Sequence, residues 1–203
     1  MRVLVLGGCG IQGKTAVFDL AGTTDVKQVI CADVNLEGIK EMSDFIDMSK
    51  IRTESLDAAD SESLDRLFRQ ADVVIDLLPR QFLETVCQAA IRAGVSVVNT
   101  NYAYPVAHLN EKARSAGVAI MPECGLDPGI DLVLYGEARR RFDELNVINS
   151  YCGGFPERAA CDNPLNYKVS WVFEGVLAST KRNSRFVREG AVIDIPGAHQ
   201  HDP

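Results

Sequence analysis

Short apolar segments alternate with amphipathic ones along the first 140 residues of the chain. The apolar segments are rich in Val, Ile and Leu, which is typical of strands buried on both faces of a sheet. We predict strands at residues 3–6, 26–32, 51–56, 72–78, 95–98 and 118–121. The intervening patterns predict helices at residues 14–20, 36–48, 61–70, 82–93 and 106–116.

Strands of this kind that alternate with helices predict an α/β fold with a doubly wound parallel sheet. Ser61 opens a capping-box sequence, and Gly94 follows the helix that ends at residue 93. Asp127 and Pro128 predict the N-cap and first turn of a further helix that runs to about residue 142. We therefore place a first domain at residues 1–125.

The pattern changes after residue 146. Residues 147–152 read as a strand, and two glycines end it. A polar segment follows, then a short helix at about 170–180. Two further strands at 185–189 and 191–195, joined at Glu189 and Gly190, predict a hairpin.

The composition of the chain argues against two classes of binding partner. The chain has 203 residues, 46% of them hydrophobic, and a net charge of −7 without a long basic run. Nucleic acid and an anionic membrane surface are therefore not expected as partners. The six cysteines are scattered without C-x-x-C pairs, which favours a reducing cytoplasm over disulfides or a metal site. No signal peptide or membrane-spanning segment is predicted.

The glycine-rich start supports two hypotheses about its ligand. Gly8, Gly10 and Gly13 spell G-x-G-x-x-G, the turn of dinucleotide-binding folds. The same stretch, continued through Lys14 and Thr15, spells the phosphate loop of a nucleotide triphosphatase. In that second interpretation Asp76 serves as the magnesium-binding acid. A glycine turn without a ligand is the third alternative.

Asp33 favours the dinucleotide. It lies 20 residues after Gly13, directly behind an apolar run, where an acid binds the ribose hydroxyls. A carboxylate at this place repels a 2′-phosphate, so NAD is favoured over NADP. Backbone at Ile11, Gln12, Leu77, Leu78 and Pro79 is expected to complete the cofactor site at the ends of the first and fourth strands.

Four downstream stretches make the resemblance to a family specific. ECGLDPGID (residues 123–131), YCGG (151–154), DNPLNYKVSW (162–171) and EGVL (174–177) resemble the saccharopine dehydrogenase family. Their order and spacing match from residue 1 to about 196, and they argue against the phosphate-loop interpretation.

The resemblance implies a Rossmann domain, followed at residues 126–203 by the start of an α/β domain for substrate binding and dimerisation. It also implies hydride transfer between NAD or NADP and the C–N bond of an amino acid derivative, as in lysine metabolism. Family members continue well beyond residue 203, so we expect the second domain to be incomplete here. Asp33 keeps lysine 6-dehydrogenase and carboxynorspermidine-type dehydrogenases as alternatives, and a non-catalytic NAD-binding regulatory protein is another.

The resemblance also implies roles in the reaction. Asp127 matches an acid at the substrate cleft; the alternative is that it serves only as a helix N-cap. Cys152 matches a cysteine beside the substrate; the alternative is that it is a small, buried hydrophobic residue. Tyr102 matches a tyrosine near the nicotinamide; the alternative is that its side chain packs in the core.

A polar stretch is expected to hold the substrate. Its members are Asn163, Asn166, Tyr167 and Lys168, of which the lysine or the asparagines would bind a carboxylate. A solvated loop is the alternative for Lys168. Trp171 is expected in a core or an interface, and the three histidines have no assigned role.

Overall fold

The computed structural model describes residues 1–169 and 173–199. The chain divides into two compact units, Met1–Cys152 and Gly153–Pro203. The first unit contains a six-stranded sheet and the second a two-stranded one. Trp171 and His201 lie outside the described residues.

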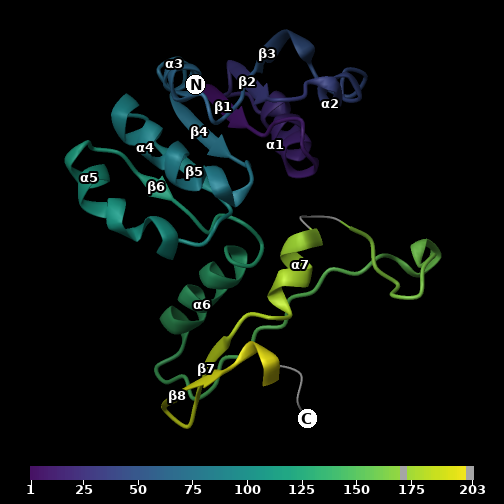
Figure 1. The fold of residues 1–203 in the computed structure, drawn as a ribbon, viewed down its shortest axis with the longest axis vertical. Helices are drawn as coiled ribbons and strands as arrows, with labels where there is room; N and C mark the ends of the chain where they lie inside the picture. Colours follow the sequence, from purple (N-terminus) through teal and green to yellow (C-terminus); the bar gives the residue numbers. More distant parts are fainter. Residues whose placement is uncertain (170–172, 200–203) are drawn as a thin grey trace. The chain divides into compact units, whose positions relative to one another are not determined.

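The first sheet is parallel throughout, with the strand order β3-β2-β1-β4-β5-β6 (Figure 1). Its strands are β1 (Arg2–Leu6), β2 (Gln28–Asp33), β3 (Ile51–Ser55), β4 (Val73–Asp76), β5 (Val97–Asn99) and β6 (Ile120–Met121). The chain winds outward in one direction from β1 to β3 and in the other from β4 to β6. The order therefore reverses between β1 and β4, which confirms the predicted doubly wound fold and creates the crevice where such sheets bind ligands.

Helices cover both faces of this sheet. They are α1 (Ile11–Gly22), α2 (Glu37–Lys40), α3 (Ser61–Phe68), α4 (Leu83–Ala93) and α5 (Asn110–Ser115), with 3-10 turns η1 (Met48–Lys50), η2 (Arg80–Phe82) and η3 (Tyr104–Leu109). A further helix, α6 (Ile130–Arg141), follows β6 and has no buried residue. Leu4 and Leu6 pack into a core with residues of α3 and α4, whereas Val3 and Val5 pack with residues of α1. Alternate side chains of β1 thus enter opposite cores, as a strand buried on both faces requires.

The helix predicted from residue 61 begins there, but its predicted cap is wrong, and α6 begins two residues later than predicted. Asp60, not Ser61, caps α3, because its carboxylate accepts hydrogen bonds from the N–H groups of Glu62 and Ser63. Asp127 caps no helix, since α6 begins at Ile130 behind Gly129, whose φ of 155° is open to glycine alone. Gly129 N–H donates instead to Asp131 Oδ1 at 2.7 Å.

Two longer elements were also predicted wrongly. The helix expected at 36–48 is only Glu37–Lys40, followed by turns that bury Met42. The strand expected at 147–152 is an exposed, irregular segment that pairs with no described strand. At residues 36–48 packing of Ile39, Met42 and Ile46 into the core decides the outcome, whereas residues 147–152 have no described strand to pair with.

The second unit contains α7 (Phe173–Ser179), a 3-10 turn η4 (Arg158–Ala160), the strands β7 (Ser184–Arg188) and β8 (Ala191–Ile195), and a 3-10 turn η5 (Gly197–His199). The predicted hairpin is confirmed: β7 and β8 are antiparallel, and the turn residues Glu189 and Gly190 have φ values of 52° and 75°. Positive φ at both turn positions matches the right-handed twist of the strands. Arg185 and Asp194 form a salt bridge across the hairpin.

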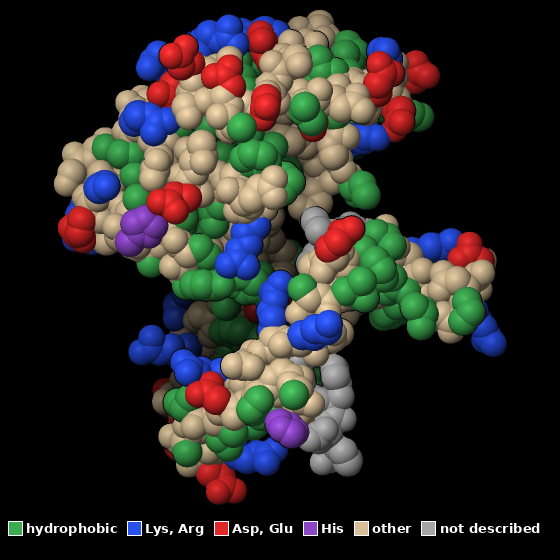
Figure 2. All heavy atoms as spheres, viewed as in Figure 1, with side chains coloured by type: hydrophobic (Ala, Val, Ile, Leu, Met, Phe, Trp, Pro, Cys, Tyr) green, Lys and Arg blue, Asp and Glu red, His purple; other side chains and the backbone are tan. Residues whose placement is uncertain are grey.

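Surface charge is mixed. Figure 2 shows Lys and Arg side chains interspersed with Asp and Glu on the drawn face of the first unit. None of the helices in the described part of the chain is long and apolar enough to cross a bilayer.

Candidate dinucleotide-binding site

The loop between β1 and α1 closes tightly against the sheet. The N–H groups of Gly7 and Gly8 both donate to the carbonyl of Ala32 in β2, at 2.9 and 3.2 Å. Gly10 N–H donates a hydrogen bond to the Gly7 carbonyl at 3.1 Å, which closes the turn. These bonds place the loop at the carboxyl end of β1, where the strand order reverses.

Glycine is required at two positions of this loop. A Cβ on Gly13 would lie 2.0 Å from the Gly7 carbonyl oxygen, so only glycine lets α1 approach the turn this closely. Gly7 has a φ of 73°, and a Cβ there would lie 2.9 Å from the Leu77 carbonyl oxygen. The loop therefore contacts both its own helix and the segment that follows β4.

The start of α1 offers unpaired backbone donors. Gly10 precedes the helix in an extended conformation, and no side chain caps the first turn. No acidic residue lies in that turn. The N–H groups of Ile11, Gln12 and Gly13 thus face the loop at the positive end of the helix dipole, an arrangement that binds the pyrophosphate of a dinucleotide.

Asp33, at the end of β2, holds the loop from the other side. Its Oδ2 accepts a hydrogen bond from Cys9 N–H at 3.0 Å, and its Oδ1 accepts one from Asn35 N–H at 3.1 Å. Each carboxylate oxygen can accept more than one hydrogen bond, so capacity remains for ribose hydroxyls. The same carboxylate can therefore orient the glycine loop and bind a ribose.

Leu77, Leu78 and Pro79 form the opposite wall of the crevice. Leu77 N–H donates to the Leu6 carbonyl at 3.0 Å, which carries the segment alongside the end of β1. Leu78 N–H donates to Asp76 Oδ1 at 3.0 Å. The predicted cofactor segments at residues 8–13, 33 and 77–79 thus meet at the carboxyl edge of the sheet, where the strand order reverses.

The same turn recurs at the ends of three strands. Asp33, Asp76 and Asn99 each end a strand, and each accepts a hydrogen bond from the N–H two residues further on. Such turns fix the direction in which a chain leaves a strand. Asp76 and Asn99 are only 1% exposed, and burial raises the pKa of Asp76 to about 7.

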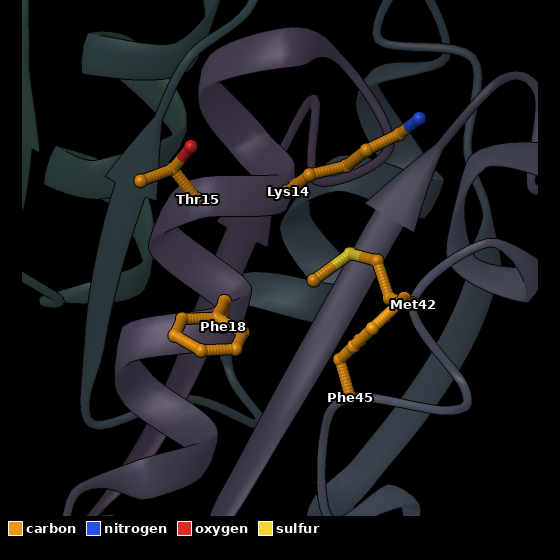
Figure 3. Close-up of a pocket in the computed structure, with 5 residues that line it drawn as sticks. All are labelled: Lys14, Thr15, Phe18, Met42 and Phe45. Carbon is orange, nitrogen blue, oxygen red and sulfur yellow. The ribbon is translucent and has the colours of Figure 1, made fainter.

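Lys14 and Thr15 have partners that the phosphate-loop interpretation does not predict. The Lys14 ammonium forms an ion pair with Glu41, and the Thr15 hydroxyl donates to the Ile11 carbonyl. Both residues line an open hollow of about 290 Å³, together with Phe18, Met42 and Phe45. Figure 3 shows these five side chains. This hollow is largely apolar and lies beside α1, so it adds nothing to a phosphate site.

Tyr102 and Asp127 lie in the segments that follow β5 and β6. Tyr102 is half exposed, and its ring centroid lies 6.5 Å from that of Tyr104. Asp127 is exposed, in a segment that returns to the end of β5 through a hydrogen bond from Cys124 N–H to the Asn99 carbonyl. Cys152 is exposed at the end of the first unit.

The polar stretch of the second unit organises itself locally. Asn163 donates to the Tyr167 carbonyl at 2.8 Å and accepts from the N–H groups of Leu165 and Tyr167. Lys168 forms a 2.6 Å ion pair with Asp162 and lowers the pKa of that carboxyl. Asn166 adopts a φ of 49° within this turn. Asn163, Asn166, Tyr167 and Lys168 therefore belong to one turn, and their role in substrate binding stays a prediction.

Two glycines important to the site were missed by the motif. Gly7 precedes the G-x-G-x-x-G pattern, and its positive φ gives no signal in the sequence beyond the glycine itself. A Cβ on Gly38 would lie 2.6 Å from the Cys9 carbonyl oxygen, a contact between segments far apart in the chain.

A glycine turn against a helix start, with an acid at the end of β2, defines a dinucleotide-binding Rossmann fold. Two family models cover almost the whole chain: the saccharopine dehydrogenase NADP binding domain at residues 3–121 and the saccharopine dehydrogenase C-terminal domain at residues 125–203. The chain belongs to the saccharopine dehydrogenase family, and its first domain is the nicotinamide-dinucleotide-binding domain of that family.

Individual relatives agree with this assignment. The chain is 36% identical over 200 residues to the L-glutamate-forming, NADP(+) saccharopine dehydrogenase of Pyricularia oryzae, covering 96% of this chain and 43% of the relative. It is 33% identical to the enzyme of the same name from Saccharomyces cerevisiae, covering 96% and 44%. The structure of the apo yeast enzyme matches with a TM-score of 0.79 over 97% of this chain and 44% of that one. The chain thus spans less than half the length of these relatives.

Proposed function

We propose that this chain forms the cofactor-binding part of a nicotinamide-dependent oxidoreductase that acts on the C–N bond of an amino acid derivative. The proposed reaction interconverts saccharopine with glutamate and aminoadipate semialdehyde. The observation that carries the proposal is that the start of α1, the Asp33 carboxylate and the Leu77–Pro79 segment meet where the strand order reverses, in a chain of this family. We place the boundary with the substrate domain near residue 125.

The residues of the crevice fit a dinucleotide. Gly10 carries no Cβ that would screen the backbone N–H groups from a pyrophosphate, and Gly13 lets α1 pack closely against the turn. Asp33 would accept hydrogen bonds from a ribose, and the backbone of residues 77–79 would border the second ribose. When bound, the nicotinamide supplies or accepts the hydride.

The remaining roles concern protons and carboxylates. We propose that Asp127 moves a proton at the reacting nitrogen or at the carbinolamine oxygen, because it is an exposed carboxylate in the segment that passes the end of β5. Cys152 would lie beside the substrate without acting as a nucleophile, since hydride transfer to an imine needs no thiol adduct. Residues 163–168 would hold a substrate carboxylate, and a homodimer in the cytoplasm stays a prediction.

We also propose that NAD is preferred over NADP. The Asp33 carboxylate already accepts two backbone hydrogen bonds, which hold it in the place where a 2′-phosphate would lie. Repulsion between these two anions disfavours NADP. The curated relatives named above carry NADP(+) in their names, so cofactor preference is the sharpest point of difference to test.

Two measurements test the proposal. NADH and NADPH are titrated separately against the chain by protein fluorescence or calorimetry, and Asp33→Asn is titrated in parallel. We expect tighter binding of NADH, and a change in the NADH-to-NADPH ratio toward NADPH in D33N. Equal binding of both cofactors by the unaltered chain would contradict the NAD preference.

Turnover is then measured with saccharopine and with lysine, following reduced cofactor at high pH. Turnover with saccharopine supports the proposed reaction, and turnover with lysine alone favours a lysine 6-dehydrogenase. Binding of the cofactor without turnover on either substrate would restrict the proposal to cofactor binding by this part of the chain.

A further inference from the structure

Arg80 links two loops at the carboxyl edge of the sheet. It directly follows Pro79, at the end of the segment that borders the cofactor crevice. One of its guanidinium nitrogens donates a hydrogen bond to the Tyr104 hydroxyl at 2.8 Å, and the guanidinium carbon lies 5.7 Å from the centre of the Tyr104 ring. The loop after β4 is thereby joined to the loop after β5.

Tyr102 extends this contact toward the predicted substrate position. Its ring lies 6.5 Å from that of Tyr104, and both rings are exposed. Arg80, Tyr102 and Tyr104 therefore form one cluster, called here the Arg80 cluster. It presents a cation and two phenol hydroxyls to solvent on the first unit.

Buried side chains hold both loops of the cluster in place. Asp76 fixes the turn that leads to Arg80, and Asn99 fixes the turn that leads to Tyr102. Glu123 accepts a hydrogen bond from Ala103 N–H at 3.0 Å, between the two tyrosines. A binding site on supports of this kind is pre-organised, because its loops need little further ordering when a ligand arrives.

The cation of the cluster is not neutralised by an acid. Among residues 1–169 and 173–199, Arg80 forms no ion pair with an Asp or Glu side chain, whereas Arg2, Arg52 and Arg92 each do. A guanidinium has five N–H donors, and only one is directed to Tyr104. The remaining donors form the planar fork that matches a carboxylate.

The position of the Arg80 cluster in the sheet indicates which ligand it binds. Asp33 and β2 lie on one side of the strand-order reversal, and β4 and β5 lie on the other. In doubly wound folds the two halves of a dinucleotide lie on the two sides of this point. A ribose held by Asp33 therefore leaves Arg80 on the nicotinamide side, where the substrate is expected.

We propose that Arg80, Tyr102 and Tyr104 form a subsite that binds a carboxylate of the amino acid substrate. This inference rests on the proposed function and names a further specificity-determining residue for it. Arg80 binds the carboxylate through its planar fork. Tyr104 orients the guanidinium, and Tyr102 lines the subsite.

The test measures binding of small probes to the 203-residue chain saturated with NADH. L-glutamate carries both carboxylates, L-glutamine replaces the side-chain carboxylate by an amide, and L-isoglutamine replaces the α-carboxylate. Affinities are measured by calorimetry or NMR titration for the unaltered chain, Arg80→Met, Arg80→Lys and Tyr104→Phe. Arg114→Met is the matched control, because Arg114 is an exposed arginine of α5 in the same unit.

We expect the unaltered chain to bind glutamate about 10- to 100-fold more tightly than one of the two amides, which is typical of a charge-assisted hydrogen bond. R80M should lose this discrimination, R80K should keep part of it, and Y104F should weaken it by a smaller factor. R114M should keep it in full. NADH binding should change less than about twofold in all variants.

Each outcome separates the subsite from the proposed function. Equal binding of glutamate and both amides by the NADH-bound chain, or full discrimination in R80M, would overturn the carboxylate subsite. Neither result touches the cofactor site. Absence of NADH binding by the unaltered chain would instead overturn the proposed function and the subsite with it.

Discussion

Asp76 and Asn99 occupy registered positions on the neighbouring strands β4 and β5, and each buries a polar atom that has no hydrogen-bond partner among the described residues. The atoms are Asp76 Oδ2 and Asn99 Nδ2, an acceptor and a donor. Registered residues of parallel strands point to the same face of a sheet, here the face covered by α4. The pair therefore lies beneath the two turns that shape the crevice and support the Arg80 cluster.

The first prediction concerns pH. Burial raises the pKa of Asp76 to about 7 in the folded protein, whereas an unfolded aspartate ionises near roughly pH 4. Between these values the folded chain holds a proton that the unfolded chain has released. The free energy of unfolding from this group is therefore fully present below about pH 4 and falls as the pH rises to about 7, by at most about 1.4 kcal/mol per pH unit.

Asp76→Asn should remove this slope in denaturant titrations at successive pH values. Asp72→Asn is the control, because hydrogen bonds from Arg2 lower the pKa of Asp72 and its stabilisation is lost as the pH falls. The slope between pH 4 and 7 should persist in D72N. A slope of equal size in D76N would show that Asp76 is not the group responsible.

The second prediction concerns the coupling of Asp76 and Asn99. Asn99→Asp places two carboxylates at registered positions in a buried region, so it should destabilise the fold. Exchanging the two residues, as Asp76→Asn with Asn99→Asp, restores one amide and one carboxylate. The double variant should be more stable than the sum of the single changes by about 0.5–3 kcal/mol. Additive losses in a double-mutant cycle would mean that the two side chains act independently.

The third prediction concerns the glycine loop. Gly13→Ala places a Cβ 2.0 Å from the Gly7 carbonyl oxygen, so the loop must move and dinucleotide binding should be lost. A loss of about 1–3 kcal/mol in the free energy of unfolding is typical of overpacking. Gly22→Ala, at the other end of α1, meets nothing within 4 Å and should bind NADH normally. Retained NADH affinity in G13A would contradict the role of the loop.

The fourth prediction concerns the cysteines. Burial raises the pKa of Cys87 to about 12 and that of Cys31 further, and both thiols are inaccessible. Iodoacetamide near pH 7.5 should therefore label the exposed Cys124 and Cys152 and spare Cys31 and Cys87, as measured by mass spectrometry.

Cys9 is the informative case among these thiols. It is partly accessible within the glycine loop, and burial raises its pKa. NADH should slow its labelling while leaving that of Cys124 unchanged. Equal labelling of Cys9 with and without NADH would argue against a dinucleotide at the loop.

Elements were predictable where one local signal decides the structure. The short apolar runs at β1, β2 and β4, rich in β-branched residues, favour buried strands, and Glu189-Gly190 favours one hairpin geometry. Helix starts were less predictable, because Asp60 and Ser61 are both good caps and Gly129 gives no sign that its φ is positive. The helix expected at 36–48 already ends at Lys40, and Gly38 within it lies against Cys9.

The residues of the candidate site also divide into those that a local pattern predicts and those that it does not. Gly13 and Asp33 follow a spacing set by the fold, so the motif finds them. Arg80 and Tyr104 are 24 residues apart, as are Cys9 and Asp33, and no local pattern connects either pair. Such contacts depend on which strands become neighbours, which is a property of the sheet.

The hydrogen bond from Cys9 N–H to Asp33 has a consequence for how cofactor preference can change. The carboxylate that would distinguish the two riboses also anchors the loop that would hold the pyrophosphate. Selection between the two cofactors at the ribose is therefore coupled to binding of the pyrophosphate, because both depend on the Asp33 carboxylate. A replacement at position 33 that removes the side-chain acceptor alters both at once, so it requires a second change that gives the Cys9 N–H a new acceptor, whereas Asp33→Asn keeps one acceptor oxygen.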